Sequence, residues 1–94
     1  MTRTLVLLTR PLADAPKAKR TAALATATEV ALLENGVYTT EAERAALAPD
    51  GPAAAHWRAL DVDVAARRIA SSFDTLSCEQ VVEAIERNET IITL

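Results

Sequence analysis

The stretch that decides the fold is Ala31-Leu32-Leu33-Glu34-Asn35-Gly36-Val37-Tyr38, an apolar run that stops at an Asn-Gly pair. Its first residues are apolar without alternation, which is typical of a strand covered on both faces, as in a parallel sheet. Asn35 and Gly36 tolerate a positive φ angle, so we expect a tight turn where this strand ends. Sites in open α/β sheets gather at the carboxyl ends of strands. Glu34, Asn35, Gly36 and Tyr38 are therefore candidates for a strand-end site or a subunit contact.

The rest of the chain alternates between strand-like and helix-like segments. The sequence predicts strands at residues 4–9, 30–33, 56–62, 73–76 and 89–94. It predicts helices at residues 15–27, 40–48, 63–70 and 77–87, and a loop at 49–52. Asp63 is expected to cap the third helix, and Ser77 with Gln80 has the capping-box spacing for the last one. This order predicts one small α/β domain over residues 1–94, with a mostly parallel sheet of about five strands and helices on both faces.

The composition predicts a thin core. Half of the 94 residues are apolar, but much of that share is alanine, and the only aromatic residues are Tyr38, Trp57 and Phe73. Alanine favours helix but buries little surface, so we expect exposed apolar surface that a partner covers. The net charge of −3 gives no reason to expect direct binding to nucleic acid.

Several classes of site find no support in the sequence. The chain has no glycine-rich phosphate loop, and its lone His56 has no ligand spacing around it, so we expect no cofactor and no metal site. The apolar run at residues 5–8 is too short for a signal-peptide core or a membrane span. A single cysteine excludes an internal disulfide, and the cytoplasm is the expected compartment.

That cysteine, Cys78, is the candidate catalytic residue, and two interpretations stay open for it. At the start of the last helix, free backbone N–H groups favour a thiolate, which could accept sulfur from a persulfide. Alternatively, Cys78, Val81, Val82 and Ile85 form one helical stripe that faces the sheet, and the cysteine is a small buried apolar residue. The pattern favours the second interpretation, and exposure of the sulfur decides between them.

Two segments of the chain resemble the TusB/DsrH family of small sulfur-relay subunits. Leu32-Leu33-Glu34-Asn35-Gly36-Val37-Tyr38 is similar to the family signature Leu-Leu-x-(Glu)-Asp-Gly-Val-Tyr, with Asn35 in place of aspartate. Residues 59–67, Ala-Leu-Asp-Val-Asp-Val-Ala-Ala-Arg, are similar to a later family segment, with Arg68 where glycine is usual. Arg20 lies near the position where some sulfur-oxidiser members carry a cysteine in their first helix, so this chain lacks that thiol.

The resemblance implies a flavodoxin-like fold and a single DsrH/TusB-like domain that assembles with two related DsrE/DsrF-like (TusD/TusC-like) subunits into a heterohexamer. It implies persulfide transfer, either toward 2-thiolation of wobble uridine in tRNA or in dissimilatory sulfur oxidation. In such relays the best-attested persulfide-carrying cysteine lies on another subunit. We therefore expect a non-catalytic or accessory assembly subunit of a sulfurtransferase complex. A thiol carrier that uses Cys78, a small α/β ligand-binding module unrelated to sulfur, and self-association all stay open.

Overall fold

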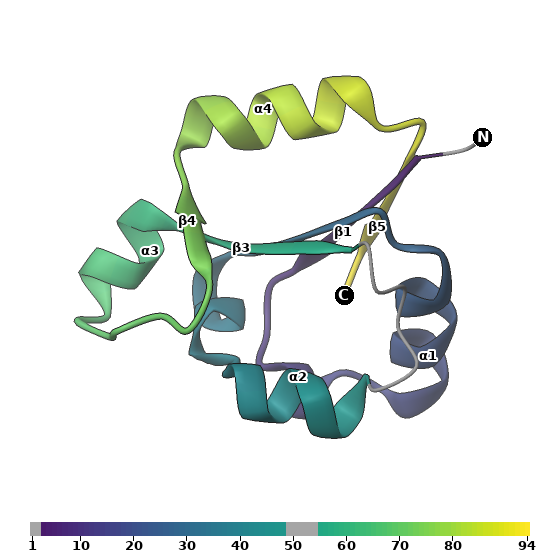
Figure 1. Cartoon of the computed structure of the whole chain (residues 1–94), viewed down its shortest axis with the longest axis horizontal. Coiled ribbons are helices and arrows are strands. Elements are labelled where there is room, and N and C mark those ends of the chain that lie inside the picture. Colours follow the sequence, from purple (N-terminus) through teal and green to yellow (C-terminus); the bar gives the residue numbers. More distant parts are fainter. Residues whose placement is uncertain (1–2, 49–54) are drawn as a thin grey trace.

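The computed structural model describes residues 3–48 and 55–94, and it contains one five-stranded, all-parallel sheet (Figure 1). The strands are β1 (Thr4–Leu8), β2 (Glu29–Leu32), β3 (His56–Leu60), β4 (Asp74–Leu76) and β5 (Thr90–Thr93). Their order across the sheet is β4-β3-β2-β1-β5, and β1 pairs with β2 in parallel. The predicted α/β fold with a parallel sheet is thus confirmed. The loop predicted at 49–52 lies outside the described residues.

Helices cover both faces of the sheet, as predicted (Figure 1). The α-helices are α1 (Lys17–Thr26), α2 (Glu41–Leu47), α3 (Asp61–Ala66) and α4 (Cys78–Arg87), and two 3₁₀ turns are η1 (Leu12–Asp14) and η2 (Glu34–Tyr38). Figure 1 shows α1 and α2 on one face and α4 on the other. The chain moves from β1 to β4 in one direction and then returns past β1 to β5. Because parallel crossovers are right-handed, this reversal places α4 on the opposite face.

The two faces are packed very differently. The α1/α2 face carries the larger core, formed by Val6, Leu8, Leu12, Ala23, Leu24, Ala27, Val30, Leu32, Val37, Ala48, Ala59 and Leu94. Trp57 and Phe73 stack against this core with their ring centroids 5.8 Å apart, so Trp57 has a packing role. On the α4 face, the buried apolar residues among those described are Leu5, Ala31, Leu76 and Ala84. The predicted thin core is therefore a property of the α4 face.

Two of the helices, α4 and α2, begin close to where the sequence predicts, and α3 does not. Ser77 caps α4, and the predicted capping box is present because the Ser77 side chain accepts from the Gln80 N–H while the Gln80 side chain accepts from the Ser77 N–H. Thr40 caps α2 in the same way through the Glu43 N–H. The prediction that Asp63 caps α3 is wrong, because this helix begins at Asp61 and leaves the Asp63 carboxylate free for another contact.

A buried carboxylate fixes α4 to the sheet at the amino end of the strands. Glu29 accepts hydrogen bonds from Arg87 and Asn88 at the end of α4 and from Arg58 of β3. The guanidinium of Arg3 also lies near it, with Nη2 3.8 Å from Glu29 Oε2. The hydrogen bonds from Arg87 are the main cause that lowers the pKa of Glu29 to about 2. Burial opposes this shift, while Asn88 and the positive charges reinforce it. We call these five side chains the Glu29 cluster.

Candidate functional site at the carboxyl edge

All the strands end at the same edge of the sheet, because the sheet is parallel. η2 follows β2, α3 follows β3 directly, and α4 follows β4 after a single residue. Figure 1 shows α3 and the start of α4 together at this edge. The edge therefore brings the residues predicted at the end of β2 into the same region as Cys78, although they lie far apart in the sequence.

Gly36 is needed here because of space and not because of its φ angle. A Cβ atom at this position would lie 1.9 Å from the carbonyl oxygen of Leu8, at the end of β1. The expected positive φ angle at Asn35 or Gly36 is wrong: in this turn it occurs at Glu34, with φ of 51°. The Gly36 N–H donates to the Leu33 carbonyl at 2.8 Å, which closes the turn, and the Leu33 N–H donates to the Leu8 carbonyl at 2.9 Å, which joins the turn to β1.

Two hydrogen bonds hold η2 against α3 and Arg67, the residue that directly follows this helix. The Glu34 N–H donates to Asp63 Oδ2 at 2.7 Å, and Arg67 Nε donates to Asn35 Oδ1 at 3.1 Å. Arg67 also pairs with Asp63 at 3.4 Å, one helical turn away. We call these four residues the η2–α3 clamp. It joins the two segments that carry the family resemblance.

The sequence pattern singled out Glu34 and Asn35 but gave Asp63 and Arg67 no part in the site. A signal was present, since Asp63 and Arg67 have the i, i+4 spacing of a helical ion pair. However, the sequence does not show that Asp63 and Arg67 lie beside η2. This proximity comes from the pairing of β2 with β3, which aligns Leu32 with Ala59. The clamp thus depends on tertiary structure that local spacing does not reveal.

Apolar side chains are exposed on both elements of the clamp. Tyr38 at the end of η2 is 46% exposed, and Val62 in the first turn of α3 is 53% exposed. Both are large enough to matter in a protein contact, and a tyrosine combines apolar area with a polar tip. This corner therefore presents apolar surface on a base that is held in place by polar contacts.

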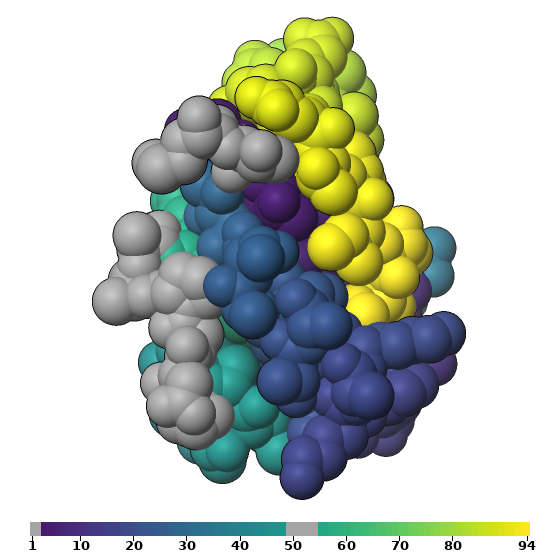
Figure 2. Space-filling model, turned by 90° about the vertical axis from the view of Figure 1, so that its right-hand side faces the viewer, coloured from purple at the N-terminus to yellow at the C-terminus, as the bar shows by residue number. Residues whose placement is uncertain are grey.

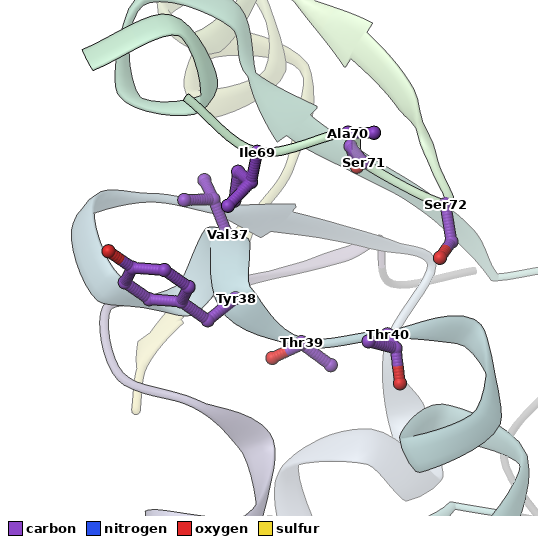
Figure 3. Close-up of a pocket in the computed structure, with 8 residues that line it drawn as sticks. All are labelled: Val37, Tyr38, Thr39, Thr40, Ile69, Ala70, Ser71 and Ser72. Atoms are coloured by element: carbon purple, nitrogen blue, oxygen red, sulfur yellow. The ribbon is translucent and has the colours of Figure 1, made fainter. Parts of the chain in front are cut away.

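A pocket of about 170 Å³ lies beside Tyr38, between η2 and the segment that follows α3 (Figure 3). Its lining residues are Val37, Tyr38, Thr39, Thr40, Ile69, Ala70, Ser71 and Ser72. Three of the hydroxyl groups are used within the fold: Thr39 accepts from the Leu12 N–H, Thr40 caps α2, and Ser71 accepts from the Phe73 N–H. Among the described residues, the lining contains no carboxylate, histidine or cationic side chain. Its chemistry suits binding of an apolar group better than acid–base catalysis.

Cys78 is exposed at the first position of α4. The prediction that Cys78, Val81, Val82 and Ile85 form one sheet-facing stripe is wrong for Cys78, Val82 and Ile85, which are all exposed, whereas Val81 does pack against the α4-side core. The interpretation of Cys78 as a buried structural residue fails with it. An exposed sulfur is open to reaction with another protein's persulfide.

The helix contacts the sheet through Val81 and two residues outside the predicted stripe. Val81 packs against the α4-side core, Ala84 is fully buried, and Asn88 just past the helix is buried beside Glu29. This set is centred roughly 80° around the helix from the predicted stripe, less than the 100° between successive residues. The Glu29 cluster selects this rotation because it places Arg87 and Asn88 at Glu29, and small Ala84 lets the helix approach closely.

A scan against protein-family models finds no match to this chain, and a search of curated proteins finds none either. The family resemblance therefore rests on the two segments described above. Within residues 3–48 and 55–94, no helix has the length and apolar character needed to cross a membrane. In the same ranges, no three side chains of the kinds that bind metal ions come together.

Proposed function

We propose that this protein is a subunit of a cytoplasmic sulfur-relay complex, and that it serves in assembly and does not itself carry the sulfur. Its partners in this proposal are two related DsrE/DsrF-like subunits, and the pathway is tRNA wobble-uridine 2-thiolation or sulfur oxidation. The observation that supports the proposal is the η2–α3 clamp. The two segments that resemble the TusB/DsrH family are in direct contact, so the resemblance covers one local structure.

The chemistry of this corner favours binding over catalysis. Two charged side chains of the clamp are used internally, since Asp63 and Arg67 bond each other and η2, while the exposed Glu34 contributes its backbone N–H. The exposed apolar side chains of Tyr38 and Val62 lie on the same two elements. A contact on a pre-ordered base loses less conformational entropy on association than one on a loose loop. This combination suits a surface that docks against a related subunit.

The test is co-expression with the two related subunits, followed by affinity purification and light scattering. We expect a stable heteromer with the native chain and a weaker one with Tyr38→Ala. Tyr38→Phe is the matched control, because it keeps the ring and removes only the hydroxyl. A monodisperse monomer that does not bind the co-expressed subunits would contradict the proposal.

A second candidate function, a thiol carrier, is supported by the exposure of Cys78. In that reaction the Cys78 thiolate attacks the outer sulfur of a donor persulfide. The new S–S bond forms on Cys78 as the donor's S–S bond breaks, and the donor leaves as a thiolate, so no oxidant or reductant is consumed. Mass spectrometry after incubation with a persulfide donor should then show one added sulfur on the native chain and none on Cys78→Ser. If the native chain is never labelled, the assembly role stands alone.

A further inference from the structure

β5 is an edge strand whose outer backbone groups have no strand partner among residues 3–48 and 55–94. On its inner side, the Thr90 and Leu94 N–H groups donate to the carbonyls of Arg3 and Leu7, at 3.2 and 2.8 Å. A strand in a parallel pair turns alternate residues toward its neighbour. The N–H and C=O groups of Ile91 and Thr93 therefore point outward, away from β1. Figure 2 shows this C-terminal segment, in yellow, open on the surface between α4 and α1.

The two edges of the sheet differ in how they are protected. Natural edge strands commonly resist pairing by being short or by carrying charge or proline. β4 follows this rule: it has three residues and begins with Asp74, which lies 3.7 Å from His56. β5 reads Thr-Ile-Ile-Thr, without a charge or a proline. The β5 edge is therefore open to another strand.

Exposed apolar side chains border the same edge. Ile91 aligns with Leu5, whose side chain belongs to the α4-side core, so Ile91 points to the α4 face, where it is partly exposed. Arg87 reaches from α4 toward β2 and β3, so the opposite flank of the helix faces β1 and β5. That flank carries the exposed Val82 and Ile85. Ile91 and these two residues are thus exposed apolar side chains on the side of the molecule that carries the open strand edge.

We propose that β5 pairs antiparallel with β5 of a second copy of this chain across a two-fold axis, which joins two sheets into one. With Ile92 on the axis, the outward N–H and C=O groups of Ile91 form hydrogen bonds with those of Thr93 in the second copy. The same bonds form between Thr93 of the first copy and Ile91 of the second. All outward groups of the strand then have partners. Ile91 and the α4 flank of each copy form one shared apolar surface.

The chemistry of the strand favours a second copy as the occupant. A two-fold axis places a strand opposite itself, which is unfavourable wherever like charges meet. Residues 90–94 carry no charged side chain, so self-pairing brings no like charges together within the strand. The spacing along α4 places Glu79, Glu83 and Glu86 on the side away from the sheet, outside this contact. The inference is independent of the proposed function, because it concerns the isolated chain.

Light scattering and sedimentation on the isolated protein, over a concentration series, test the proposal. We expect a dimer that becomes a monomer in Thr93→Pro and in Ile91→Lys. Proline at Thr93 removes only an outward N–H, which an edge strand tolerates, and lysine places a charge at the edge. Ala46→Lys is the matched control, because it adds the same charge at an exposed position of α2, away from the β5 edge, and should leave the dimer intact.

Amide hydrogen exchange on the native chain provides a test that needs no variant. In the dimer, the Ile91 and Thr93 amides should be protected and should lose that protection on dilution, while the inward Ile92 amide changes little. A monomer at every concentration, a dimer that survives both edge substitutions, or Ile91 and Thr93 amides that exchange freely in the dimer would overturn the proposal.

Discussion

The two ends of the sheet are each held by an acidic side chain bonded to arginine, yet the two arrangements do different work. At the amino end, Glu29 is buried and receives hydrogen bonds from the end of α4 and from β3. At the carboxyl end, Asp63 lies near the surface and ties η2 to α3. Ion pairs contribute little where water competes, whereas removing one partner of a buried pair is costly. We therefore infer that the amino end stabilises the fold and the carboxyl end shapes the site.

The largest effect should come from Gly36, the one place where the carboxyl end also supports the fold. Gly36→Ala places a methyl group 1.9 Å from the Leu8 carbonyl oxygen, a backbone atom that cannot move aside without shifting β1. We expect a loss of about 4 kcal/mol in the free energy of unfolding, measured by denaturant titration. Asn35→Ala is the control, and it should cost less than about 1 kcal/mol because its side chain is exposed. A fully stable Gly36→Ala would show that η2 does not lie against β1 as described.

Glu29→Ala should have the next largest effect. The substitution leaves Arg58 and Asn88 without the carboxylate that they bond, in surroundings where water replaces it poorly. We expect a loss of about 3 kcal/mol in the free energy of unfolding, since Arg3 and Arg87 are half exposed and can be solvated. Glu89→Ala removes a nearby exposed carboxylate and should change stability by less than about 0.5 kcal/mol. If Glu29→Ala and Glu89→Ala lower the free energy of unfolding equally, the inference that the amino end of the sheet stabilises the fold is wrong.

The same cluster predicts how stability depends on pH. The pKa of Glu29 falls from 4.5 to about 2 on folding, so the folded state favours the ionised form. The stability that this carboxylate contributes is therefore fully present above pH 4.5 and is lost as the pH falls toward 2. We expect a loss of about 2 to 3 kcal/mol across this range, read as the difference between native protein and Glu29→Gln in denaturant titrations at each pH. Parallel pH profiles for the two proteins would contradict this assignment.

These effects also show which features the sequence can predict. The strand and helix order followed from apolar runs, turn residues and the Ser77–Gln80 capping box, because each is set by neighbours in the chain. The rotation of α4 did not follow, because polar contacts at Glu29 override the apolar pattern of Val82 and Ile85. Amphipathic periodicity assumes that apolar side chains face the core, and a buried ion-pair cluster breaks that assumption.

The candidate site shows the same limit. The sequence located Glu34 to Tyr38 correctly at the end of a strand, since an apolar run that stops at Asn-Gly is a local signal. It gave the wrong reason for Gly36, because the close approach of the Leu8 carbonyl belongs to a different strand. It also missed Asp63 and Arg67 as partners of η2, since only the pairing of β2 with β3 brings them there.

The smallest effect on stability should come from Asp63, and this prediction is the sharpest test of the comparison. In Asp63→Ala the Glu34 N–H loses its acceptor but remains at the surface, where water can replace the carboxylate, so the free energy of unfolding should fall by less than about 1 kcal/mol. The Glu34 amide should nevertheless exchange about fivefold faster or more, because the local restraint on η2 is gone. Asp61→Ala is the matched control, since within the described part of the chain the Asp61 carboxylate accepts a hydrogen bond from the adjacent Val62 N–H alone. If Asp63→Ala instead costs about 2 kcal/mol or more of global stability, the clamp is a structural element like the Glu29 cluster and the division of work between the two ends fails. If the Glu34 amide exchanges at its native rate, η2 is ordered without α3, and the pre-ordered surface beside Tyr38 does not depend on the clamp.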